Sequence, residues 1–172
     1  MPRIALDLNK AEDRAKVGGG AWRRAIGYDP SLPTAGVALE TPGSSARLPD
    51  FDDSAWAVCD DIREFVSTGF TFGWYRIAIE IPAALEGHSR AGAAVYFETN
   101  IDDYGEVWID GEIDYPEGSV AGYNKGQRVL VTRSAEPGKR HVIACIAANG
   151  PFGKPNGGVF MRYATLAFEW RA

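Results

Sequence analysis

The chain has 172 residues and a formal net charge of −5, from 18 basic and 23 acidic residues. This length suits one globular domain, and a hydrophobic content of 45% is far from that of a disordered chain. No cluster of Lys and Arg forms a basic stripe, which argues against a nucleic-acid partner. No apolar run approaches the roughly 20 residues of a membrane-spanning helix, which argues against a membrane partner.

The N-terminal third is rich in Gly, Pro and Ser between short structured runs. Residues 8–17 (LNKAEDRAKV) predict a turn or two of helix, and no signal-peptide apolar region precedes them. Residues 1–48 as a whole predict a segment that wraps the domain as an edge strand and loops. Residues 54–65 (SAWAVCDDIREF) predict either a short helix or an irregular connection.

The rest of the chain alternates apolar and polar residues, which is the pattern of half-buried strands. In residues 73–82, Tyr75 and Ile77 share one face, whereas Trp74 and Arg76 share the other. Further strands are predicted at residues 93–100, 127–134, 139–150 and 159–170. In residues 105–114 (GEVWIDGEID), Asp110 and Gly111 predict a tight turn that needs positive φ at both positions.

About seven or eight strands with this spacing predict an all-β fold, an antiparallel β-sandwich of the jelly-roll type with one or two short helical turns. We expect residues 1–172 to form a single domain, with 1–48 as the wrapping segment and 49–170 as the jelly-roll core. Cys59 and Cys145 make no disulfide framework, and together with the absent signal peptide they predict a cytoplasmic location.

The order of segments in residues 49–170 resembles the galactose-binding-like jelly-roll domain that accompanies family 2 glycoside hydrolases. The segments that carry the likeness are PDFDDSAW, GWYRIAIEIP, VYFETNIDDYGEVWIDGE, GYNKG, PGKRHVIACIAANGP and GGVFMRYATLAF. The second half also looks like the domain joined to gluconolactonase-type propellers. The resemblance implies a fold that hosts sugar binding, scaffolding and occasionally catalysis. Neither a barrel nor a propeller module is present in these 172 residues, which implies an accessory role beside a partner enzyme subunit.

The leading hypothesis is a non-catalytic module that binds a carbohydrate or small polar ligand. Sugars need an aromatic platform for their C–H faces and polar side chains for their hydroxyls. We expect these residues on the outward face of the 73–82 strand, on the next strand and on the neighbouring loops. The candidates are Trp74, Arg76, Tyr96, Asn100, Tyr104, Tyr123, Asn124, Asn149 and Phe152.

One alternative is a small hydrolase or lyase that acts on a glycoside or lactone through paired carboxylates. Glycoside cleavage needs two carboxyl groups about 5 Å or roughly 6.5–9.5 Å apart. Glu98 and Glu106 would face each other if their strands pair, and Asp102 and Asp103 lie in the loop between them. His141, at the start of a strand, is the further catalytic candidate.

Another alternative is a structural module whose exposed sheet face buries against a second copy or another protein. No cofactor is predicted, although jelly rolls of this type often hold a structural calcium ion in a loop. Its candidate ligands are Asp52, Asp53, Asp102 and Asp103. The sequence contains no D-x-[DN]-x-[DN]-G loop that would specify the ion.

Overall fold

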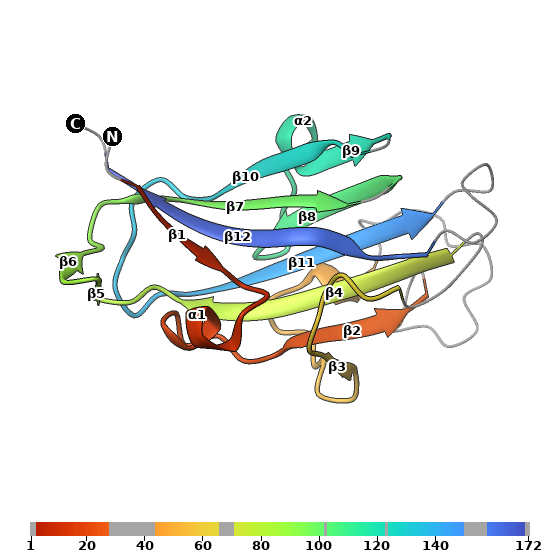
Figure 1. Cartoon of the computed structure of the whole chain (residues 1–172), viewed down its shortest axis with the longest axis horizontal. Helices are drawn as coiled ribbons and strands as arrows, with labels where there is room; N and C mark the ends of the chain where they lie inside the picture. The colour runs from red at the N-terminus through yellow and green to blue at the C-terminus, as the bar shows by residue number, and fades with distance from the viewer. Residues whose placement is uncertain are drawn as a thin grey trace.

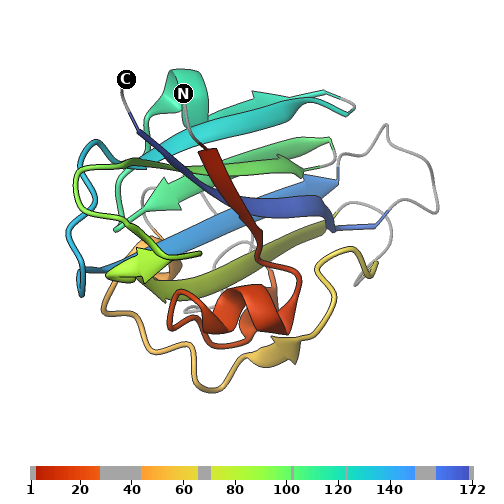
Figure 2. The ribbon, with the colours of Figure 1, turned by 60° about the vertical axis from the view of Figure 1, so that its left-hand side comes forward.

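The computed structural model describes residues 3–27, 44–65, 71–101, 103–122, 124–149 and 158–170. Its strands form two main antiparallel sheets that pack face to face (Figures 1 and 2). The smaller sheet has the order β1 (Arg3–Asp7), β12 (Met161–Glu169), β7 (Ala94–Ile101), β10 (Gly126–Thr132). The larger sheet has the order β3 (Ala57–Cys59), β2 (Trp22–Ile26), β4 (Thr71–Glu80), β11 (Arg140–Asn149), β8 (Tyr104–Ile109), β9 (Ser119–Ala121). The predicted all-β antiparallel sandwich is confirmed.

The main core lies between the two sheets. From β4 it takes Tyr75, Ile77 and Ile79, and from the smaller sheet it takes Phe97 and Phe168, all at most 2% exposed. Each such side chain contributes roughly 1.5–3 kcal/mol when it leaves water. The alternation in residues 73–82 therefore predicted the inward face of β4 correctly.

A second apolar cluster covers the outer face of the larger sheet. Trp74, Trp108 and Ile146 pack there against Ala46, which belongs to the 3₁₀ helix η2 (Ser45–Arg47), and Trp56 packs on the same cluster. The larger sheet is thus buried on both faces where residues 44–56 cross it. The N-terminal third also supplies β2, an interior strand between β3 and β4, so it is built into the sandwich in addition to wrapping it.

The helical elements are short. Helix α1 (Ala11–Ala15) confirms the predicted turn in residues 8–17. Residues 54–65 contain no α-helix, because Ala57–Cys59 pair with β2 as the edge strand β3, so the helical alternative for this segment was wrong. Helix α2 (Tyr115–Gly118) was not predicted, and its Pro116 sits in the first turn, where a missing N–H costs little.

The predicted turn at Asp110–Gly111 is present, with φ of 51° and 86°. A single bridge joins Ile109 and Glu112 across this turn, and the longer partners of β8 are β11 and β9. A separate small hairpin joins β5 (Ala84–Leu85) to β6 (His88–Ser89). Strands β1 and β12 pair with Arg3 opposite Glu169, so the two ends of the chain lie at one corner (Figure 1). Among the described residues, no helix has the length and apolar character needed to cross a membrane.

Candidate ligand-binding groove

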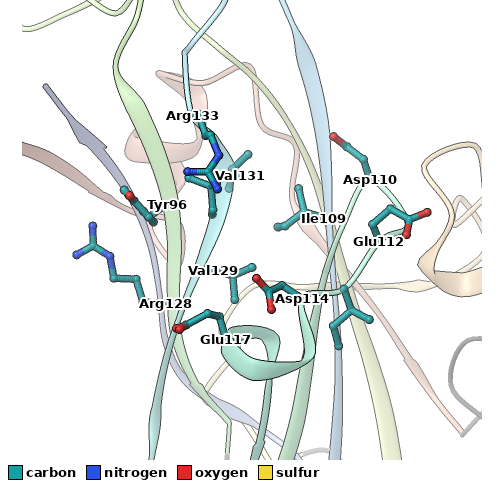
Figure 3. Close-up of a pocket in the computed structure, with 12 residues that line it drawn as sticks. Tyr96, Ile109, Asp110, Glu112, Asp114, Glu117, Arg128, Val129, Val131 and Arg133 are labelled. Atoms are coloured by element: carbon teal, nitrogen blue, oxygen red, sulfur yellow. The ribbon is translucent and has the colours of Figure 1, made fainter. Parts of the chain in front are cut away.

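A groove of about 690 Å³ lies at the side of the sandwich where β10 forms the edge of the smaller sheet. Its other walls are the loop after β8 and helix α2 (Figure 3). The groove exists because β10 and β8 belong to different sheets, and α2 fills only part of the space beside them. The lining residues are Tyr96, Ile109, Asp110, Glu112, Ile113, Asp114, Glu117, Arg128, Val129, Leu130, Val131 and Arg133.

The floor of the groove is apolar. Ile109, Val129 and Val131 belong to the main core and are at most 9% exposed, so the groove opens directly onto the edge of that core. Alternation in β10 places these valines inward and Arg128 outward. A ligand in the groove would therefore meet a fixed apolar surface with charged groups around it.

The rim of the groove carries charges of both signs. Four carboxylates come from the stretch between β8 and the end of α2, and two guanidinium groups come from β10 and the residue after it (Figure 3). The carboxylates belong to Asp110, Glu112, Asp114 and Glu117, and the guanidinium groups belong to Arg128 and Arg133. Carboxylate oxygens accept hydrogen bonds and guanidinium groups donate them. The rim can therefore accept hydrogen bonds from the hydroxyl groups of a ligand and also donate hydrogen bonds to them.

Tyr96 and Arg128 form a stacked pair on one side of the groove. The guanidinium carbon of Arg128 lies 3.9 Å from the centre of the Tyr96 ring. Arg128 is held in this position by Glu169, whose Oε2 is 2.8 Å from Nη2, and by Glu98, whose Oε1 is 3.6 Å from Nη1. The stack is therefore fixed by an ion-pair network across three strands, which makes it a preorganised wall.

Asp110 connects the groove to His141. The Asp110 Oδ2 atom lies 2.6 Å from His141 Nδ1, and its Oδ1 atom accepts the Val142 backbone N–H at 2.8 Å. These bonds hold a residue whose φ of 51° is uncommon outside glycine. His141 is 3% exposed and does not line the groove, so its imidazole supports the turn from below.

The structure corrects the expectation that Trp74 and Arg76 form an exposed platform. Trp74 is 0% exposed and Arg76 is 2% exposed, because residues 44–56 cover this face of the larger sheet. Arg76 Nε donates to Asp53 Oδ2 at 2.9 Å, and its other nitrogens donate to the carbonyls of Ala46 and Phe51. Both side chains therefore serve the fold at this point.

The remaining predicted binding residues are spread over several places. Tyr96 lines the groove. Asn100 and Asn124 lie together, with Asn100 Nδ2 donating to Asn124 Oδ1 at 3.0 Å, and Asn149 is 5% exposed. Tyr104, on β8, is 36% exposed, and its hydroxyl donates to Glu106 Oε1. The predicted residues Tyr123 and Phe152 lie outside the described residues.

The predicted pair of Glu98 and Glu106 is not brought together. The proposal required β7 and β8 to pair, but β7 belongs to the smaller sheet and β8 to the larger one. Alternation turns each carboxylate to the outer face of its own sheet, since Phe97 and Val107 beside them are in the core. Glu98 pairs with Arg3 at 2.6 Å, and Glu106 accepts the Trp108 indole N–H at 3.1 Å. The facing geometry expected for this pair was therefore wrong.

The predicted calcium ligands do not form a cluster in the described part of the chain, where no group of three His, Cys, Asp or Glu side chains could hold a metal. Asp52 accepts the Ser54 backbone N–H at 2.9 Å, a bond that lowers its pKa, and Asp53 is paired with Arg76. The carbonyl oxygen of Asp103 accepts the Gly122 N–H, and Asp102 lies outside the described residues. A calcium ion in these loops stays a prediction.

Most of the groove was missed at the level of sequence. The signal was present in DGEIDYPE, residues 110–117, which holds four acidic residues in a short stretch directly after a strand. The sequence predicted a hairpin over residues 105–114 with its turn at Asp110–Gly111, and it assigned no binding role to the acidic residues of this stretch. Charged residues that follow a strand edge this densely indicate an exposed rim, because they cannot all be buried.

Comparisons with known proteins define the class of fold. Three similar solved structures are a Bacteroides uniformis β-glucuronidase, a family 2 glycosyl hydrolase from Bacteroides cellulosilyticus DSM 14838, and a Faecalibacterium prausnitzii β-glucuronidase. Their TM-scores are 0.61, 0.59 and 0.53, and each is 16% identical to this chain. The matches cover 97%, 98% and 97% of this chain, but only 18%, 21% and 31% of the respective structures.

The chain therefore has the fold of a jelly-roll domain contained in family 2 glycoside hydrolases, and the predicted resemblance is confirmed at the level of fold. It corresponds to a minor part of those enzymes. No protein-family model matches the sequence, and no curated protein does. Another similar structure is a calcium-binding mutant of Bacteroides uniformis β-glucuronidase 2, with a TM-score of 0.60 and 17% identity. The likeness to the domain joined to gluconolactonase-type propellers stays a prediction.

Proposed function

We propose that the protein is a non-catalytic module that binds a carbohydrate or a similar polyhydroxylated ligand in the groove beside β10. The observation that carries this proposal is the combination of an apolar floor, the Tyr96–Arg128 stack and a rim of carboxylates. Ligand sites are commonly concave, mostly apolar and equipped with a few fixed polar groups. The groove is concave and has an apolar floor and fixed polar groups, and its charged rim makes it more polar than most such sites.

The size and chemistry of the groove support a sugar. Its volume of about 690 Å³ lies within the range of roughly 300–1,000 Å³ typical of small-ligand sites. Val129 and Val131 offer apolar surface to the C–H groups of a pyranose ring, while Asp114 and Glu117 accept from its hydroxyl groups and Arg133 donates to them.

The wider role that fits this site is that of an accessory subunit of a sugar-processing enzyme. Three structures with the same fold, two of them β-glucuronidases, carry it as a minor part of a larger chain. We propose a cytoplasmic location, since Cys59 and Cys145 are both free and buried. Association with a partner enzyme or with a second copy belongs to the same proposal.

Isothermal titration against a panel of methyl glycosides and short oligosaccharides tests the proposal. Tyr96→Ala and Glu117→Gln should weaken binding, because each removes a group from the wall of the groove. Tyr163→Ala is the matched control, since Tyr163 is a 40% exposed tyrosine of the same sheet that does not line the groove. Absence of heat with folded protein across the panel, or equal weakening by all three variants, would contradict the proposal.

A further inference from the structure

A second cavity, of about 470 Å³, lies where the start of β1 pairs with the end of β12. Its walls are the start of β1, the β5–β6 hairpin and Trp170, which follows β12. Its lining residues are Arg3, Ile4, Glu86, His88, Ser89 and Trp170. None of them lines the groove beside β10, so the cavity is a separate feature of the surface.

Trp170 is held in the cavity wall by Arg90. The guanidinium carbon of Arg90 lies 4.0 Å from the centre of the Trp170 ring, and Arg90 itself is 0% exposed. Arg90 therefore covers one face of the indole from inside the protein. What Trp170 presents to the cavity is its other face or its edge, held by the stack and by packing of the ring on the main core.

The same arginine fixes the polar part of the wall. Its Nε and Nη2 atoms donate to the His88 carbonyl at 2.9 and 2.6 Å, and Nη2 also donates to the Leu85 carbonyl at 3.0 Å. These bonds fasten the hairpin whose residues Glu86, His88 and Ser89 line the cavity. One buried side chain therefore positions the aromatic ring and the backbone of the hairpin before any ligand arrives, which lowers the entropy cost of binding.

The lining matches the chemistry of a sugar ring. Trp170 and Ile4 offer apolar surface for its C–H groups. Glu86 accepts from hydroxyl groups, Arg3 donates to them, and His88 and Ser89 can do either. Arg3 is oriented by ion pairs to Glu98 at 2.6 Å and to Glu169 at 3.6 Å. The volume is within the range of small-ligand sites and smaller than that of the groove.

We propose that this cavity is a second carbohydrate subsite, which takes a single pyranose unit against Trp170 and the β5–β6 hairpin. The cavity and the groove share no lining residue, and they are linked only through Glu98 and Glu169, which pair with Arg3 in the cavity and with Arg128 in the groove. With both sites occupied, one chain would hold two units of the same polysaccharide. The second contact would then be intramolecular, and it would raise the overall affinity without any new interaction.

The test is a titration of ¹⁵N-labelled protein with methyl β-glucopyranoside and methyl β-galactopyranoside, followed through backbone and indole N–H signals. The Trp170 indole signal is assigned by its loss in Trp170→Phe. We expect at least one of the sugars to shift the Trp170 signal together with the amides of His88 and Ser89. The indole signals of Trp22 and Trp74, which are 0% exposed, should stay in place.

Trp170→Ala should raise the Kd of the sugar at this cavity by about tenfold or more, because the aromatic contact is lost. Glu86→Gln and Ser89→Ala change exposed side chains and keep the stack of Arg90 on Trp170. They should therefore reduce the sugar-induced shifts of the same N–H signals while the fold is unaffected. Shifts at Glu117 and Arg128 report on the groove and separate the two sites. If both sugars leave Trp170, His88 and Ser89 unshifted in folded protein, the subsite is refuted, whatever the groove does.

Discussion

Replacing Asp53 with alanine would leave the guanidinium of Arg76 buried without its carboxylate. The two groups meet at 2.9 Å on the outer face of the larger sheet, where Arg76 is 2% exposed and the side chain of Asp53 is 30% exposed. The pair also joins the segment that contains Asp53 to the central strand β4. The change therefore acts on the attachment of residues 44–56 to the sheet.

The magnitude follows from the burial of the two partners. Removing one member of a buried ion pair costs about 3–5 kcal/mol, because the other charge stays out of water and unpaired. Asp53 retains some contact with solvent, so we expect the lower end of this range, about 3 kcal/mol. In a domain of this size each kcal/mol lowers the Tm by about 2–4 °C, which gives a decrease of about 6–12 °C.

Urea unfolding and thermal unfolding, both followed by circular dichroism, measure this change. Asp50→Ala is the matched control, since Asp50 is exposed in the same segment and its loss should change stability by less than about 0.5 kcal/mol. Arg76→Met combined with Asp53→Asn removes both charges and should recover most of the loss. A cost below about 1 kcal/mol for Asp53→Ala would refute the reasoning that the pair is a buried attachment.

Three further outcomes are expected. Asp61 accepts from Arg63 and Asn9, and the hydrogen bonds from Arg63 hold its pKa well below the usual range; Asp61→Asn should therefore destabilise the protein at neutral pH. The difference in unfolding free energy between this variant and the original protein, measured by urea titration, should shrink only as the pH falls below about 3.8. The reason is that the hydrogen bonds from Arg63 need the ionised carboxylate. Burial raises the pKa of the Cys145 thiol, so a thiol reagent should label it at the rate of unfolding, and fast labelling in native buffer would count against its burial. Gly105→Ala would place a Cβ 2.5 Å from that of Ile101 and should cost about 1–3 kcal/mol in unfolding experiments, whereas Gly20→Ala, with open space around it, should not.

Sequence alternation predicted the strands well because their inward residues must be apolar. It identified the inward face of β4 from Tyr75, Ile77 and Ile79. It could not show that the other face of the same strand is also buried, because the cover comes from residues 44–56, which are distant in sequence. A tryptophan and an arginine on an outward face fit an open binding platform and a covered sheet equally well.

The sequence pattern also could not predict which strands pair with each other. The short connection between Ile101 and Tyr104 favours a hairpin, but the chain crosses there from one sheet to the other. A period of two residues determines which face a side chain takes and carries no information about the neighbouring strand. For this reason Glu98 and Glu106 were expected together, whereas the groove beside β10, formed between two sheets, was not found.

The pairing of β1 with β12 places Arg3 opposite Glu169, so the beginning and the end of the described chain are neighbours. A short flexible linker could therefore join them without disturbing either sheet, and new ends could be opened in a surface turn such as the one at Gly138, where φ is 83° and no atoms crowd the Cβ position. Such circular permutants would move any fused protein from that corner to the turn just before β11 while keeping the same sandwich. The domain is thus a scaffold whose points of attachment can be chosen independently of its fold.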